Sequence, residues 1–86
     1  MAEKSLKEVG KVTHYFTRIG VAVIELTDTL SVGDRIQFQG ATTNFEQTVA
    51  SMQIEHKNIT TAEKGQSVGL KVEQRVREGD IVYKIM

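Results

Sequence analysis

The sequence contains no cysteine, no charge excess of either sign and no long apolar run, and each absence excludes a class of protein. Without cysteine, the chain of 86 residues can hold neither a disulfide framework nor a thiolate metal site. Eleven Lys and Arg residues balance eleven Asp and Glu residues, so the net charge does not attract nucleic acid in general, and no DNA partner is expected. No segment approaches the roughly 20 apolar residues of a membrane-spanning helix, and no signal-peptide core is visible. The sequence therefore predicts a cytoplasmic protein with no membrane partner.

The chain repeats one pattern from Glu8 onward: a short run rich in Val, Ile, Phe or Tyr, then a turn that carries Gly, Asp or Asn. Residues 1–7 precede this pattern and are predicted to form a flexible tail, which leaves 8–86 as a single domain. Strands are predicted over residues 8–16, 21–26, 35–39, 46–57, 67–73 and 80–84. Val32-Gly33-Asp34 is predicted to form a tight turn, because glycine tolerates positive φ and aspartate can hydrogen-bond its own backbone. Six strands with short links favour a closed β-barrel, because closure leaves no exposed strand edge.

Two of these predicted strands carry more specific expectations. Side chains alternate along a strand, so Gln53 and Lys57 are predicted to share the polar side of 46–57, with His56 on the apolar side. The nearly continuous apolar stretch at 21–26 predicts a strand that is buried on both faces or crosses between layers.

Three segments carry a resemblance to a known family: LSVGDRIQFQG (Leu30–Gly40), VASMQIEHKNITTAEKGQSVGLKV (Val49–Val72) and VREGDIVYKI (Val76–Ile85). In order, spacing and residue type they resemble the second domain of translation elongation factors of the Tu/1-alpha type. They are also similar to the C-terminal barrel of collagenase-like peptidase family proteins, some of whose members modify RNA. The resemblance implies an all-β fold, a six-stranded closed Greek-key β-barrel of the translation-protein type.

In the elongation factors, this barrel holds the aminoacylated 3′ end of tRNA and touches the small ribosomal subunit. The acidic residue that contacts the terminal ribose aligns with Gln53, and the basic residues after it align with His56 and Lys57. A glutamine can hydrogen-bond a ribose hydroxyl but lacks the charge of a carboxylate. The resemblance implies a non-enzymatic module that binds structured RNA, either tRNA or ribosomal RNA, or the ribosome.

Six residues are candidates for contact with RNA: Gln53, His56, Lys57, Lys64, Arg18 and Lys71. The cations would contact phosphates, and the glutamine and histidine would donate hydrogen bonds. The competing interpretation is that solvent-facing lysines only keep a barrel soluble. Tyr15, Phe16 and Phe45 could stack on bases, but at least two of the three are predicted to lie in the core because the chain has few aromatic residues.

Catalytic, metal and nucleotide sites have little support in the sequence, and no cofactor is predicted. Glu55 and His56 are neighbours on a predicted strand, so they would point to opposite faces and could not chelate one ion together. No G-x-x-x-x-G-K-[ST] loop is present, since Gly10 and Lys11 precede a valine. GTPase activity is therefore not expected.

The alternative function is a protein-docking subunit of a larger enzyme, such as a relative of the collagenase-like peptidases or of the RNA-modifying proteins among them. Such a subunit should expose a contiguous apolar patch. The sequence places one candidate patch near its C-terminus, at Val82, Tyr83 and Ile85.

Overall fold

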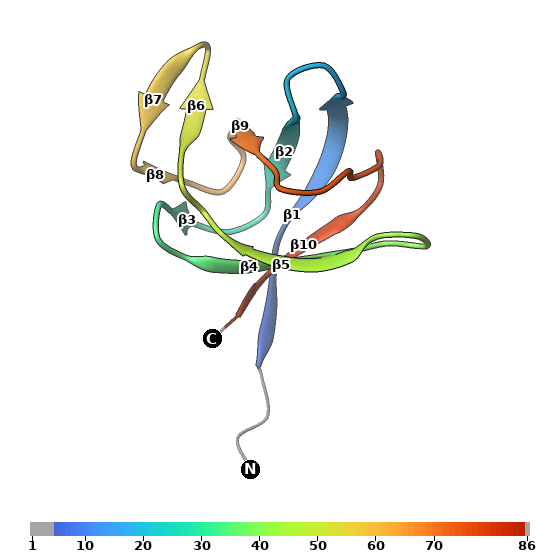
Figure 1. The fold of residues 1–86 in the computed structure, drawn as a ribbon. Helices are drawn as coiled ribbons and strands as arrows, with labels where there is room; N and C mark the ends of the chain where they lie inside the picture. Colours follow the sequence, from blue (N-terminus) through green and yellow to red (C-terminus); the bar gives the residue numbers. More distant parts are fainter. Residues whose placement is uncertain (1–4, 86) are drawn as a thin grey trace.

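The computed structural model describes residues 5–85, and within that range all regular structure is β-strand. The strands are β1 (Leu6–Phe16), β2 (Val21–Leu26), β3 (Leu30–Ser31), β4 (Arg35–Gln39), β5 (Asn44–Thr48), β6 (Met52–Ile54), β7 (Lys57–Ile59), β8 (Thr61–Ala62), β9 (Ser67–Lys71) and β10 (Ile81–Ile85). Eight of them form one antiparallel sheet in the order β5-β4-β10-β1-β2-β9-β6-β7, and β3 pairs with β8 (Figure 1). The all-β prediction is confirmed. In this part of the chain, no helix is long and apolar enough to cross a membrane.

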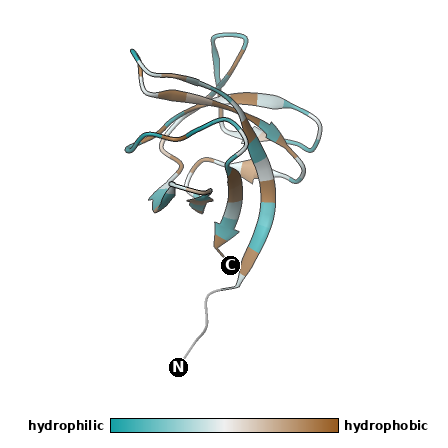
Figure 2. Ribbon diagram, turned by 90° about the vertical axis from the view of Figure 1, so that its right-hand side faces the viewer, coloured by the Kyte–Doolittle hydropathy of each residue, from teal (hydrophilic) through white to brown (hydrophobic). Residues whose placement is uncertain are grey.

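The core lies inside the curved sheet, because strands such as β2, β4, β5 and β9 bury alternate residues there. Hydrophobic and hydrophilic residues alternate along the strands in Figure 2. The largest fully buried side chains include Phe38, Ile24, Leu26 and Leu70. Apolar burial of this kind is the main stabilising term for a domain without disulfides.

Strand β1 joins the two parts of the sheet, which are β5-β4-β10 on one side and β2-β9-β6-β7 on the other. Its first half pairs with β10 and its second half with β2, and the register shifts at two bulges. Bulges bend a strand and increase its twist, which lets β1 cross from one part to the other. At the crossing, a Cβ on Gly10 would lie 2.6 Å from Cγ2 of Ile24 and 2.9 Å from the carbonyl oxygen of Glu25, so only glycine fits. The strand begins at Leu6 rather than Glu8; residues 1–4 of the predicted tail lie outside the described residues.

Three turns of one kind redirect the chain, at residues 31–34, 63–66 and 77–80. In each, the third residue is a glycine with positive φ (98°, 91° and 93°), as a type II turn requires. The fourth residue donates its N–H to the first carbonyl at 3.1 Å in all three turns. Its side-chain oxygen also accepts the first N–H, at 2.9, 2.8 and 2.9 Å. The predicted Val-Gly-Asp turn is confirmed, and the two others share its geometry.

The predicted long strand at 46–57 is wrong. Strand β5 ends at Thr48, and the backbone of Val49 bonds to the turn at residues 33–34, after which the chain crosses to β9 and forms β6. The hairpin β6–β7 then reverses through Glu55 and His56, whose φ values are 51° and 66°. Two-residue hairpin turns with positive φ at both positions favour Asn-Gly, so the residue types Glu55 and His56 do not indicate a turn.

The structure does not confirm a closed six-stranded barrel. The sheet ends at β5 and β7, and among residues 5–85 no strand ladder joins β5 to β9 or to β7. A buried side chain spans the gap beside β5 instead: Gln47 donates Nε2–H to the carbonyl of Lys71 at 2.9 Å and accepts the N–H of Glu73 on Oε1 at 2.9 Å. One side-chain amide therefore replaces a missing section of ladder.

Candidate functional site

Two hairpins, β1–β2 and β6–β7, project from the sheet on either side of β9 (Figure 1). Residues of both hairpins and of β9 line one groove. We call it the hairpin groove; its volume is about 330 Å³. It is lined by Phe16, Ile19, Val21, Val23, Gln53, Glu55, His56, Ser67, Val68 and Gly69. The lining comes from three segments that are distant in sequence and neighbouring in the sheet.

The depth of the groove follows from the strand register. One row of directly paired residues crosses five strands: His14, Val23, Gly69, Gln53 and Asn58. Paired residues in a sheet share a face, so the glycine in the middle of this row leaves a hollow between its neighbours. A Cβ at that position would meet its nearest neighbour at 3.5 Å, an ordinary contact distance. The floor is therefore open because the side chain is missing, and the backbone there needs no glycine for steric reasons.

One wall of the groove is apolar and accessible. Ile19 is 61% exposed and Phe16 is 45% exposed, and both are among the few large hydrophobic residues on the surface of the described chain. Val21 and Val23 are half-buried beside them on the outer face of β2. Of the two alternatives predicted for 21–26, burial on both faces is thus wrong, because the inner face is buried and the outer face lines this groove.

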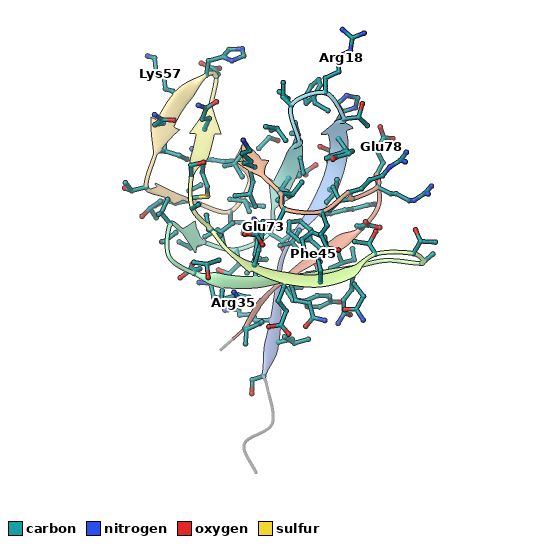
Figure 3. All side chains as sticks on the ribbon, viewed as in Figure 1. Arg18, Arg35, Phe45, Lys57, Glu73 and Glu78 are labelled. Atoms are coloured by element: carbon teal, nitrogen blue, oxygen red, sulfur yellow. The ribbon has the colours of Figure 1, made fainter. Side chains whose placement is uncertain are left out.

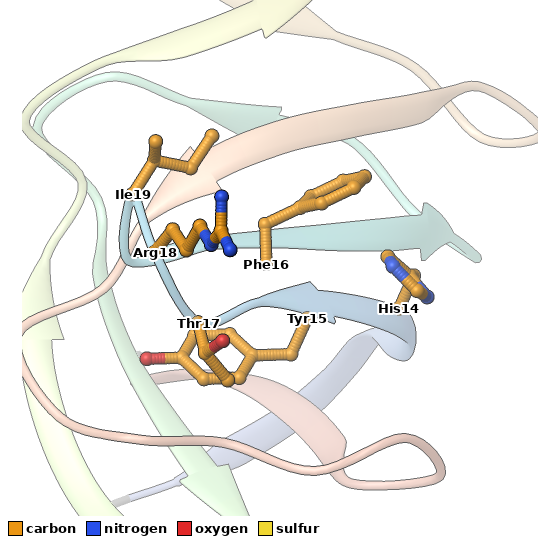
Figure 4. Close-up of a pocket in the computed structure, with 6 residues that line it drawn as sticks. All are labelled: His14, Tyr15, Phe16, Thr17, Arg18 and Ile19. Atoms are coloured by element: carbon orange, nitrogen blue, oxygen red, sulfur yellow. The ribbon is translucent and has the colours of Figure 1, made fainter.

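The hairpin β1–β2 presents different residues on its two sides (Figure 4). Phe16, Arg18 and Ile19 lie on the side opposite to Tyr15 and Thr17. The ring of Phe16 also meets the His14 ring edge-on, with the centroids 4.4 Å apart. This contact limits the orientation of the phenyl ring at the mouth of the groove.

The opposite wall of the groove is polar. Gln53 donates Nε2–H to Oδ1 of Asn58 at 2.9 Å, which fixes the orientation of the glutamine amide. Glu55 and His56 form the rim at the tip of hairpin β6–β7. Both residues have positive φ. For a residue other than glycine, this backbone conformation costs on the order of 1–3 kcal/mol of stability, and such strain is concentrated at functional sites.

The candidate RNA-binding residues are only partly brought together. Gln53 and His56 line the hairpin groove. Lys57 pairs with Ile54, so it lies on the face opposite to Gln53. The prediction that Gln53 and Lys57 share one side of a strand is therefore wrong. Figure 3 shows Lys57 and Arg18 at the tips of the two hairpins.

The remaining two cations lie farther from the groove. Lys64 is in the turn at 63–66, and Lys71 ends β9 and lines a separate hollow beside Gln47. The four cations therefore do not form one patch with the glutamine and histidine. Their role in RNA binding stays a prediction.

The placement of the aromatic residues is as predicted. Phe45 is buried and stacks on Phe38, with ring centroids 4.9 Å apart, and Tyr15 is half-buried against the core. Phe16 is the one that remains exposed. In the described residues, no group of three or more His, Cys, Asp or Glu side chains could hold a metal ion.

The predicted C-terminal apolar patch is wrong. Val82 is fully buried, and Tyr83 and Ile85 are half-buried in the sheet. The accessible apolar surface lies instead at Phe16 and Ile19, which sequence reasoning did not assign to a docking surface. The signal that could have found it is an isoleucine within a turn followed by valines at the first two outward positions of β2.

Comparison with known proteins identifies the chain. Residues 4–82 match the model of the peptidase family U32 C-terminal domain. The chain belongs to this family. An uncharacterized protease of Methanocaldococcus jannaschii is 47% identical over 77 residues, which cover 88% of this chain and 19% of that protein. A collagenase of Porphyromonas gingivalis is 37% identical over 78 residues, covering 88% of this chain and 22% of the collagenase.

Solved structures support the fold of this U32 domain. The C-terminal domain of a Geobacillus thermoleovorans protein assigned to the U32 peptidases superimposes with a TM-score of 0.85 at 23% identity, covering 88% of this chain and 96% of that one. A second structure of the same domain gives a TM-score of 0.84 at 24% identity, covering 88% of this chain and 89% of that one. The predicted similarity to the C-terminal barrel of collagenase-like proteins is confirmed. The resemblance to the elongation factor domain stays a prediction.

The U32 domain spans about a fifth of the length of the curated relatives that it matches. In those relatives, most of the polypeptide lies outside the region that resembles this chain.

Proposed function

We propose that this U32 domain is a non-catalytic docking module that associates with a larger U32-family polypeptide. The observation that carries the proposal is the hairpin groove, whose exposed wall contains Phe16 and Ile19. The family match and the length of the relatives support it, because the same domain accompanies a much longer chain in those proteins. We keep the cytoplasm as the expected compartment.

The chemistry of the groove suits a protein contact. Burial of a large apolar side chain contributes about 1.5–3 kcal/mol, and Phe16 and Ile19 are about half exposed, so covering both contributes roughly 2–3 kcal/mol. A micromolar complex needs about 8 kcal/mol. The groove therefore acts as the anchor of a larger interface, in which few residues carry most of the binding energy.

A second candidate is the binding of structured RNA, tRNA or ribosomal RNA. The observation that favours it is the position of Gln53 and His56 in one groove beside the exposed Phe16, a residue type that stacks on unpaired bases. The scattered cations and the carboxylate of Glu55 on the rim weaken the attraction for phosphates. We therefore place this candidate second.

The test is affinity capture of the tagged chain from the soluble fraction of its source cells, with and without ribonuclease. We expect a U32-family polypeptide at near-stoichiometric amounts, unchanged by ribonuclease. Recovery of tRNA or ribosomal RNA that ribonuclease removes, with no such polypeptide, would replace docking by the RNA function. Recovery of neither would reject both.

A further inference from the structure

We propose that the hairpin groove receives one large apolar side chain from an extended segment of the larger U32-family polypeptide, and that Gln53 hydrogen-bonds the backbone of that segment. This inference rests on the proposed docking function and specifies its contact. The occupant follows from three properties of the groove, its size, its fixed amide and its charge.

The size of the groove admits one large side chain together with part of the backbone that carries it. Small-molecule pockets enclose about 300–1,000 Å³, and the 330 Å³ of the hairpin groove is at the lower limit of that range. The floor at Gly69 lies between the apolar wall at Phe16 and Ile19 and the amide of Gln53. A leucine, isoleucine, methionine or phenylalanine side chain can enter there while its own backbone stays at the mouth.

The amide of Gln53 is prepared to pair with a peptide bond. Its orientation is fixed because Nε2–H donates to Asn58, which leaves the carbonyl oxygen and the second N–H of the amide for another partner. A peptide bond offers one donor and one acceptor at matching spacing. A backbone hydrogen bond at this wall would align the segment and bring its side chain over Gly69.

The charge around the groove favours a polypeptide over a nucleic acid. The residues that line it include the carboxylate of Glu55 and the imidazole of His56 but no lysine or arginine. Arg18 lies on the same side of hairpin β1–β2 as Phe16 and Ile19, at the hairpin tip and outside this lining. Affinity for nucleic acid comes mainly from cations that contact phosphates. An uncharged apolar segment of polypeptide can bind without such cations.

The experiment compares two groove variants with a matched control in the capture described above. Ile19→Ser removes the most exposed apolar side chain of the wall, and Gly69→Val fills the floor. Val32→Ser is the control, because Val32 is 40% exposed but does not line the groove. We expect each groove variant to recover about tenfold less U32-family polypeptide, and the control to match the unmodified chain.

A photo-crosslinking residue placed at position 19 or at position 32 identifies the occupant directly. We expect position 19 to crosslink to a segment of the U32-family polypeptide that contains a large apolar residue, and position 32 to give no such product. Thermal unfolding checks the fold: Gly69 has no positive φ, so Gly69→Val should unfold no earlier than the unmodified chain. If Gly69→Val does unfold earlier, the conclusion is drawn from Ile19→Ser and the crosslink.

The outcomes separate the two proposals. Capture of the U32-family polypeptide that is equal for Ile19→Ser, Gly69→Val and Val32→Ser would overturn the groove assignment and leave docking intact. A crosslink from position 19 to RNA, or to a second copy of the chain, would also overturn it. No U32-family polypeptide with the unmodified chain would reject the docking function itself.

Discussion

The buried side chain of Gln47 makes the most direct stability prediction, because it spans the gap between β5 and the end of β9. Gln47 is 2% exposed, and its amide forms two hydrogen bonds of 2.9 Å, with the carbonyl of Lys71 and the N–H of Glu73. Gln47→Leu keeps a similar volume but leaves both backbone groups without this partner. A buried polar group that loses its partner costs about 1–3 kcal/mol.

The two losses therefore sum to about 2–6 kcal/mol. Lys71 and Glu73 are exposed residues, so water can reach part of the seam, and we expect the lower half of this range, about 2–4 kcal/mol. A domain of 86 residues has a total stability of about 4–13 kcal/mol. The variant should thus lose a large fraction of its stability, and its Tm should fall by about 10–25 °C.

Urea unfolding and hydrogen exchange measure the effect and locate it. We expect Glu73 to lose amide protection in Gln47→Leu before the sheet as a whole opens. Gln37→Leu is the matched control, because Gln37 lies on neighbouring β4 and its amide donates to the exposed side chain of Asn44 rather than to a backbone group; it should change the free energy of unfolding by less than about 0.5 kcal/mol. A Gln47→Leu variant as stable as that control, with the Glu73 amide still protected, would refute the role of the amide in closing the gap.

Three further predictions test local features. Replacing Glu55 and His56 by Asn-Gly should raise the free energy of unfolding by about 1–2 kcal/mol, because these residues accept positive φ without strain; chemical denaturation checks it. Gly10→Ala should destabilise by about 1–3 kcal/mol, since the new methyl would overlap strand β2, and an unchanged Tm would contradict this. The hydrogen bond from Lys7 lowers the pKa of Asp28, so the stabilising contribution of Asp28 is present above the unfolded-state pKa and is lost as pH falls through the lowered folded value. In Lys7→Ala, an NMR titration should show that pKa rising toward 3.8.

The sequence predicted the elements that local patterning determines. The bounds of β2 and β4 coincide with the predicted 21–26 and 35–39, because each is a short run between turns, nearly continuously apolar in β2 and alternating in β4. The turn at 31–34 was predictable since glycine is required for its positive φ.

Features that depend on distant partners could not be predicted in the same way. Nothing near Glu55 marks a hairpin, and the reversal is fixed by pairing of β6 with both β7 and β9. The bridge across the gap beside β5 likewise depends on residues that are distant in the sequence. Its signal is a polar residue, Gln47, between the buried Phe45 and Val49 on the inward face of the chain, and such a residue must find a partner. That partner lies in another part of the sequence.

The sequence indicated only the polar wall of the groove. Gln53 and His56 were candidates from the resemblance, but the apolar wall was missed because 21–26 was expected to be buried on both faces or to cross between layers. A groove between two hairpins is a property of the sheet order, which brings segments 16–23, 53–56 and 67–69 together. Periodicity within any one segment carries no information about that order.

Two features that lower the stability of the domain lie together in the hairpin groove, and their coincidence supports a function for the groove. Gly69 occupies the middle of a strand without needing its conformational freedom, which costs about 0.5–1 kcal/mol relative to alanine. Glu55 and His56 hold a turn that Asn-Gly would form with less strain. A requirement for stability alone explains neither choice, nor the exposed Ile19 opposite them. A requirement for an open floor, a polar rim and an apolar wall explains all of them at once.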